Sequence, residues 1–317
     1  RTVRSMADLH RDVTEHAVRF LAEHLPADRS EPVRSAPRPS DVAVVGMAAF
    51  LPGAPNVRRY WENICRKVRS ISEIPPDRWD WRLYFAEDRR ARDKVYSRWG
   101  GFIEDVPFDP TRYGLPPQSV RSVDPMQLLT LEGVRQALED AGLDLGETDR
   151  DRISVILGAS GVGEVGMQLV SRSDLFRICE RTTPEMWDRM PEWSEDSFPG
   201  FLPNVAAGRV ANRLDLGGAN FVVDAACAAS LAAVYQAVNE IVSGRSEVAI
   251  TGGVDSAMAP FTFLSFGKTQ ALSPRGECNI FNEDADGIVI AEGVAVVVLK
   301  RLAEAERDGD RIYAVIR

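Results

Sequence analysis

Short apolar runs alternate with helix-forming stretches from residue 41 onward, and this alternation restricts the possible folds more than any other feature. The apolar runs cover residues 41–46, 152–157, 220–224, 248–251 and 294–300. The stretches with helical periodicity cover residues 57–69, 124–142, 203–213 and 228–242. Strands and helices that alternate in this way predict an α/β fold with a mainly parallel sheet. A last apolar run at residues 311–316 predicts one further strand, the beginning of a new unit.

The first 40 residues differ in character from the rest. Apolar residues at three- and four-residue spacing predict an amphipathic helix over residues 5–25, and Pro26 ends it, so that residues 1–26 form one segment. This helix is interpreted as a docking element, the tail of a preceding domain or a surface helix without a special role. Residues 27–40 are rich in Pro, Arg and Ser and predict a linker. Residues 41–317 then predict one domain, in which 75–113 form a long structured loop whose aromatic residues serve packing.

Charge and cysteine usage exclude several classes of protein. The formal net charge of -9 gives no bulk attraction to nucleic acid, and an acidic partner protein would need a local basic patch. The four cysteines match no CxxC metal pattern and predict reduced thiols in a cytoplasmic protein. Neither a signal peptide nor an apolar run long enough to cross a membrane is found in the sequence. A chain that starts on Arg1 and stops on Arg317 suggests a piece of a longer polypeptide.

Two short motifs that could bind ligands have simpler interpretations. Residues Gly161–Gly166 match GxGxxG after a predicted strand, but a dinucleotide site needs a compact βαβ unit, and the next strand begins only at residue 220. The string therefore predicts a flexible glycine loop at the rim of the sheet. Asp284 and Asp286 could form a metal pair, but Gly287 beside them favours a solvated turn.

Cys227 is the candidate catalytic residue. An apolar strand runs into Asp224-Ala-Ala-Cys227-Ala-Ala-Ser230, and a helix follows at once. At a helix N-terminus, free backbone amides and the helix dipole favour a thiolate over a thiol. A tight strand-to-helix turn that presents a nucleophile is a device of hydrolases, and the small neighbours leave room for a substrate. The segment alone leaves a second interpretation open, in which Cys227 is a small buried thiol packed beneath the helix.

The segment around Cys227 resembles the active-site string Asp-Thr-Ala-Cys-Ser-Ser-Ser of β-ketoacyl synthases, the condensing enzymes of fatty acid and polyketide assembly. Further strings similar to that family occur in the family's order between residue 41 and residue 317. They are Val44–Met47 with Leu51–Gly53, Asp124–Gln127, Ala137–Gly142, Pro203–Val210, Thr251–Val254, Ala271–Pro274 and Ala285–Gly293. The string Ala-Ala-Cys-Ala is similar to iterative systems such as polyunsaturated fatty acid and enediyne synthases.

The resemblance implies a thiolase-like fold with α-β-α-β-α layers, of which this chain would hold the first half and the start of the second. It also implies an acyltransferase that performs a decarboxylative Claisen condensation between an acyl group on Cys227 and a malonyl-type extender. No cofactor would bind directly. Phosphopantetheine would arrive on an acyl carrier protein. The second partner would be an identical copy or a chain-length-factor-like homologue, paired near residues 220–223, with no nucleic acid or membrane as partner.

The family carries two catalytic histidines, a lysine and an oxyanion loop in its second half, whereas His10, His16 and His24 all lie in the predicted N-terminal helix and are expected to face solvent. The isolated chain is therefore expected to expose apolar faces of its sheet, to fold poorly or aggregate, and not to condense. Two alternatives remain: a thiolase-type acyltransferase, and a non-catalytic or truncated synthase that binds a carrier protein or a partner synthase. The strings at Asp124-Pro125 and Ala285–Gly287 favour the synthase over the thiolase.

Overall fold

The computed structural model describes residues 15–16, 19–20, 23 and 41–317. Residues 1–39 and 40–317 form separate units. The five described residues of the first unit have helical backbone and are exposed, His16 among them. The remainder of the predicted N-terminal helix and the predicted linker lie outside the described residues.

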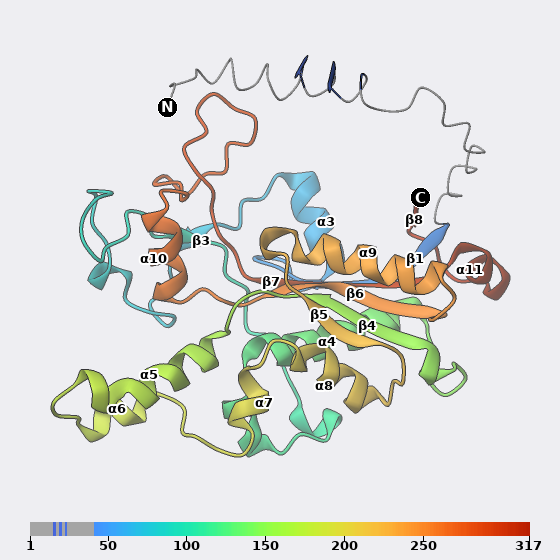
Figure 1. Ribbon diagram of the computed structural model, residues 1–317, viewed down its shortest axis with the longest axis horizontal. Coiled ribbons are helices and arrows are strands. Elements are labelled where there is room, and N and C mark those ends of the chain that lie inside the picture. The colour runs from blue at the N-terminus through green and yellow to red at the C-terminus, as the bar shows by residue number, and fades with distance from the viewer. Residues whose placement is uncertain (1–14, 17–18, 21–22, 24–40) are drawn as a thin grey trace. The chain divides into compact units, whose positions relative to one another are not determined.

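The second unit is built on a six-stranded sheet with strand order β5-β4-β6-β7-β1-β8 (Figure 1). The strands are β1 (Val42–Phe50), β4 (Ile153–Gly158), β5 (Asn220–Val223), β6 (Val248–Asp255), β7 (Gly293–Arg301) and β8 (Ala314–Ile316). Each predicted strand is present, and β1, β6 and β7 run further than the apolar runs suggested. Two short strands, β2 (Ser72–Glu73) and β3 (Trp99–Gly100), form a separate ladder.

The prediction of a mainly parallel sheet is wrong. Strand β4 pairs in parallel with β5 and β6, whereas β6 with β7, β7 with β1 and β1 with β8 are antiparallel. Helices cross over between β4, β5 and β6, as parallel neighbours require. The connection from β6 to β7 contains a helix that packs against the loop region, and β7 runs antiparallel to β6. Strands buried on both faces are apolar in either direction, so their composition did not show the difference.

Helices cover both faces of the sheet. The helices are α3 (Val57–Arg66), α4 (Pro125–Ala141), α5 (Glu164–Ile178), α6 (Pro184–Asp188), α7 (Ser197–Phe201), α8 (Val205–Leu214), α9 (Ala229–Val242), α10 (Pro260–Lys268) and α11 (Leu302–Asp308). Figure 1 shows α4 and α8 on one face of the sheet and α9 on the other. Helices α5 to α7 occupy the polar stretch before residue 203 that showed no clear periodicity in the sequence.

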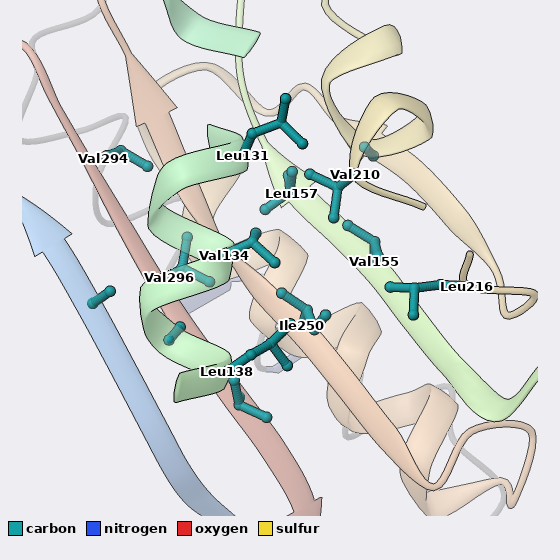
Figure 2. Packing of buried hydrophobic residues seen from close by; sticks show 14 of the residues in the cluster. Leu131, Val134, Leu138, Val155, Leu157, Val210, Leu216, Ile250, Val294 and Val296 are labelled. Carbon is teal, nitrogen blue, oxygen red and sulfur yellow. The ribbon is translucent and has the colours of Figure 1, made fainter. Parts of the chain in front are cut away.

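The larger core lies between α4, α8 and the sheet. Figure 2 shows Leu131, Val134 and Leu138 of α4 lying over labelled side chains of β4, β6 and β7. A second apolar cluster, centred on Ile156, Ala233 and Ile241, fills the space under α9. The predicted loop at 75–113 has a core of its own, in which Ile74, Tyr96 and Phe263 are buried with Trp79 packed against them. Its aromatic residues therefore serve packing, as expected.

The boundaries of α4 follow from capping. Asp124 accepts a hydrogen bond from Met126 N at 3.0 Å, Pro125 occupies the first turn, and Gly142 ends the helix at a φ of 64°. An acidic N-cap, proline in the first turn and a left-handed glycine after the end are the usual terminal signals. These signals explain why the sequence predicted this helix to within a residue.

Among the described residues, exposed apolar side chains lie mostly on helices and loops, and the sheet exposes them at its two outer strands, at Phe221 of β5 and Val315 of β8. Leu231 and Tyr235 on α9 are 75% and 65% exposed, and Trp61 on α3 is 65% exposed. The sheet itself is shielded because α4 and α8 cover one face and α9 the other. Among the described residues, no helix is long and apolar enough to cross a membrane.

A buried cluster on α4 makes stability depend on pH. Burial alone would raise the pKa of Glu132, but hydrogen bonds from Arg135, Tyr113 and Gln136 outweigh it and lower the pKa to about 2. A depressed carboxyl pKa stabilises the fold above the unfolded-state value of about 4.3, and this stabilisation is lost as pH falls toward 2. Between about pH 4.3 and pH 2 the free energy of unfolding of wild type should fall by about 3 kcal/mol more than that of Glu132→Gln. Urea unfolding of both proteins from pH 2 to pH 6 measures this difference, and parallel pH profiles would contradict it.

Candidate active site

Cys227 lies in the turn between strand β5 and helix α9. Strand β5 ends at Val223, a single 3-10 turn spans Ala226–Ala228, and α9 begins at Ala229. The predicted strand–turn–helix arrangement is therefore present. The Cys227 side chain is exposed, so the alternative of a buried packing thiol does not hold.

The backbone immediately before Cys227 is strained. Ala226 has a φ of 49°, in the left-handed region, where a residue other than glycine costs about 1–2 kcal/mol. Asp224 stabilises this conformation, because its Oδ1 accepts hydrogen bonds from Ala226 N at 2.9 Å and from Ser160 Oγ at 2.7 Å. These two bonds, the backbone one first, lower the pKa of Asp224 and keep it ionised at neutral pH. Neither Asp224 nor Ser160 was identified from the sequence as a site residue.

Two glycines let the first turn of α9 lie directly on the ends of β4 and β6. A Cβ atom on Gly158 would lie 2.4 Å from the carbonyl carbon of Ala229 and 2.5 Å from Ser230 N. A Cβ atom on Gly253 would lie 2.7 Å from the Cβ of Ser230. The absence of side chains at these positions therefore fixes where α9 starts, and with it the place of Cys227.

Cys227 lines an open pocket of about 380 Å³ at the strand ends. Its walls come from the segments after β1 and β4, from the last residues of β6, from the turn at Cys227 with the start of α9, and from the start of β7. The lining residues are Leu51, Pro52, Gly158–Ser160, Ala226, Cys227, Ala229, Ser230, Gly253–Asp255 and Ala291–Ala295. A larger cavity of about 490 Å³ is lined by residues 103–109 and does not include Cys227. We place the site in the smaller pocket because only that one contains the nucleophile.

A buried ion pair supports one wall of this pocket. Glu292 has a side chain 1% exposed and accepts hydrogen bonds from Arg78 at 2.6 Å and from Ile103 N at 2.9 Å. Burial raises the pKa of Glu292, and the guanidinium of Arg78 opposes that rise only in part. The pair joins the loop region to the start of β7. In the sequence, Glu292 stood out only as part of a family string, because a partner more than 200 positions away has no local signal.

The other residues considered from the sequence lie away from this chemistry. Asp286 accepts a hydrogen bond from Arg275 at 2.7 Å in the turn that Gly287 forms, in agreement with the turn interpretation. The glycine string at 161–166 lies between the end of β4 and the first turn of α5, where the sequence predicted a loop. Among the described residues, no group of three or more His, Cys, Asp or Glu could hold a metal ion. Cys65, Cys179 and Cys278 do not line the pocket of Cys227.

Comparison with protein families gives one match. Residues 39–305 match the model of the β-ketoacyl synthase N-terminal domain. The chain is 37% identical over 290 residues to a polyunsaturated fatty acid synthase from a Thraustochytrium species, a match that covers 87% of this chain and 10% of that protein. It is 32% identical over 281 residues to the polyketide synthase PksN of Bacillus subtilis, a match that covers 88% of this chain and 5% of that protein. The chain thus spans a small part of the curated relatives it matches.

Solved structures give the same picture. The oxazolomycin ketosynthase domain of Streptomyces albus superposes with a TM-score of 0.73 at 32% identity, over 87% of this chain and 44% of that one. The ketosynthase from module 6 of the bacillaene synthase of Bacillus subtilis superposes with a TM-score of 0.72 at 30% identity, over 87% of this chain and 42% of that one.

Proposed function

The chain belongs to the β-ketoacyl synthase family and has its thiolase-like fold, and from that premise we propose that Cys227 is the nucleophile that accepts an acyl group. The parent reaction is a decarboxylative Claisen condensation in polyketide or fatty acid biosynthesis. One observation carries the assignment: Cys227 is exposed in a strained turn between β5 and α9, and it lines the pocket at the strand ends.

The first step is acyl transfer. The Cys227 thiolate attacks the carbonyl carbon of an acyl thioester, the bond from that carbon to the carrier sulfur breaks, and the carrier leaves as a thiol after it takes up a proton. Covalent catalysis of this kind divides one difficult transfer into two easier ones. The pocket is lined by Ala226 and Ala229, whose side chains are single methyl groups, and by Gly253, which has none, so there is space for the acyl chain.

The second step forms the carbon–carbon bond. A malonyl-type thioester loses its carboxylate as carbon dioxide, and the electron pair left on its α-carbon attacks the acyl carbonyl. The bond to Cys227 then breaks, which returns the thiolate and releases a β-ketoacyl thioester. Among the described residues, no histidine lines the pocket, so the step that we assign to this chain's own residues is the acyl transfer.

We propose an acyl carrier protein with its phosphopantetheine arm as the donor partner and a second copy of the chain, or a homologue of it, at the edge of the sheet. Strand β5 lies at that edge, and its Phe221 is 37% exposed. A sheet edge offers unpaired backbone groups that favour pairing with another chain. Phe221→Asp should shift the chain toward monomer in light scattering after size exclusion. The same variant eluting as wild type would argue against this edge.

The acyl-transfer assignment is tested by peptide mapping. The chain is exposed to an acyl thioester or to cerulenin, and the modified cysteine is located by mass spectrometry. We expect the adduct on Cys227. Adducts on Cys65, Cys179 or Cys278 with none on Cys227 would refute the assignment. Cys65 and Cys278 are also exposed, which makes them internal controls for non-specific modification.

A further inference from the structure

The glycine segment, residues 158–166, joins strand β4 to helix α5, and different carboxylates hold its middle and its far end. It contains the GxGxxG string that predicted a loop and that the acyl chemistry leaves without a role. Its first residues, Gly158–Ser160, line the pocket of Cys227. Ala159 N donates a hydrogen bond to Val223 O at 3.2 Å, so the segment also follows the end of β5.

The first carboxylate is Asp224, three residues before Cys227. A single oxygen, Oδ1, accepts from Ser160 Oγ in the glycine segment and from Ala226 N in the turn. Because an ionised acceptor makes stronger hydrogen bonds than a neutral one, this oxygen ties the segment firmly to the residue that precedes the nucleophile.

The second carboxylate is Asp124, which is completely buried. Its Oδ1 accepts from Met126 N at 3.0 Å and its Oδ2 accepts from Val165 N at 3.1 Å, so it caps both α4 and α5. A Cβ atom on Gly163 would lie 2.0 Å from Oδ2, so only glycine allows the segment to pass this close. The far end of the segment is thereby fixed to the core helix α4.

We propose that Ser160 and Asp224 are positioning residues for Cys227, held in place by the glycine segment and its anchor at Asp124. This inference rests on the proposed role of Cys227 as acyl acceptor. The left-handed conformation of Ala226 persists only while its amide is bound, because the surroundings must hold an unfavourable backbone conformation. Without the shared oxygen, the turn relaxes and the sulfur loses its fixed direction toward a bound thioester.

The test compares two reagents on the full chain, each measured as a rate of modification at Cys227. Transfer from an acyl-N-acetylcysteamine thioester requires an oriented attack, whereas alkylation by iodoacetamide does not. We expect Asp224→Ala to slow acyl transfer about 10-fold and Ser160→Ala about 3-fold, since small misplacements of a reacting group are costly. Alkylation should change by less than about 2-fold in both variants. Asp224→Asn keeps an acceptor oxygen and should recover acyl transfer to within about 3-fold of wild type.

The matched control is Asp144→Ala, because Asp144 Oδ1 accepts from Gly146 N at 2.7 Å in a similar turn away from the pocket. It should leave both rates unchanged. The positioning role would be overturned by any of three results. Asp224→Ala could transfer the acyl group at the wild-type rate, Asp224→Ala could lose as much rate with iodoacetamide as with the thioester, or Asp224→Asn could fail to recover the acyl-transfer rate.

If the proposed function itself is wrong, the result differs from these, because the wild-type chain would then carry no acyl group on Cys227 after exposure to the thioester. In that case hydrogen exchange decides the positioning role. Amides of residues 159–163 and 224–228 should exchange faster in Asp224→Ala than in wild type, and not in Asp144→Ala. Unchanged exchange in Asp224→Ala would overturn the inference.

Discussion

Replacing Cys227 with alanine is expected to abolish acyl transfer to the chain. Alanine offers no nucleophile, so the covalent intermediate cannot form at this position. Loss of a nucleophile in a hydrolase reduces turnover by about 10⁶-fold, and we expect a loss of at least about 10³-fold here, the limit of a mass-spectrometric assay. Cys227→Ser should retain a weak residual rate, because a hydroxyl is far less ionised than a thiol at neutral pH.

Two further variants serve as controls for this loss. These variants are Cys65→Ser and Cys278→Ser. Cys65 lies on α3 and Cys278 lies before β7, and both side chains are exposed like that of Cys227. Each should keep the wild-type rate. Acyl transfer that survives in Cys227→Ala and disappears in one of these variants would move the nucleophile elsewhere.

Gly158→Val is expected to have the largest effect on the fold. The added Cβ would collide with backbone atoms of Ala229 and Ser230, at 2.4 Å and 2.5 Å. Backbone atoms cannot rotate away as a side chain can, so α9 must shift or β4 must bend. We expect the free energy of unfolding to fall by at least about 3 kcal/mol, which is at or above the largest usual cost of overpacking a core. Displacement of α9 should also slow acyl transfer to Cys227.

The comparison for Gly158→Val is Gly208→Ala in helix α8. A Cβ atom on Gly208 would meet only Asn220 Oδ1 at 3.6 Å, an ordinary contact. Since alanine favours a helix over glycine by about 1 kcal/mol, this variant should be as stable as wild type or more so. Urea unfolding at low protein concentration measures both changes. A Gly158→Val chain with wild-type stability would show that α9 tolerates displacement.

The sequence predicted those features that depend on neighbouring residues. The caps at Asp124 and Gly142 and the turn at Cys227 are local signals, and the structure contains all three. The direction of β7 could not be predicted, because an apolar strand has the same composition in either orientation. Helix α5 was also missed, since its almost uniform mixture of polar and apolar residues gives no amphipathic stripe.

The site was predicted only in part, for a related reason. Cys227 has a recognisable local string, but the partners around it are brought together by the fold. Ser160 lies 64 positions before Asp224, and Arg78 lies 214 positions before Glu292. Side-chain hydrogen bonds across such separations follow from the order of the strands, which one sequence does not specify.

The left-handed alanine before Cys227 has a consequence for the choice of residue at that position. Glycine there would remove the steric strain, but it would also enlarge the set of unfolded conformations that must be ordered. Valine, isoleucine or threonine would add a branched Cβ to a backbone that already crowds an alanine. In a saturation library at position 226, the variants that still accept an acyl group on Cys227 should therefore include alanine, glycine and asparagine and no β-branched residue.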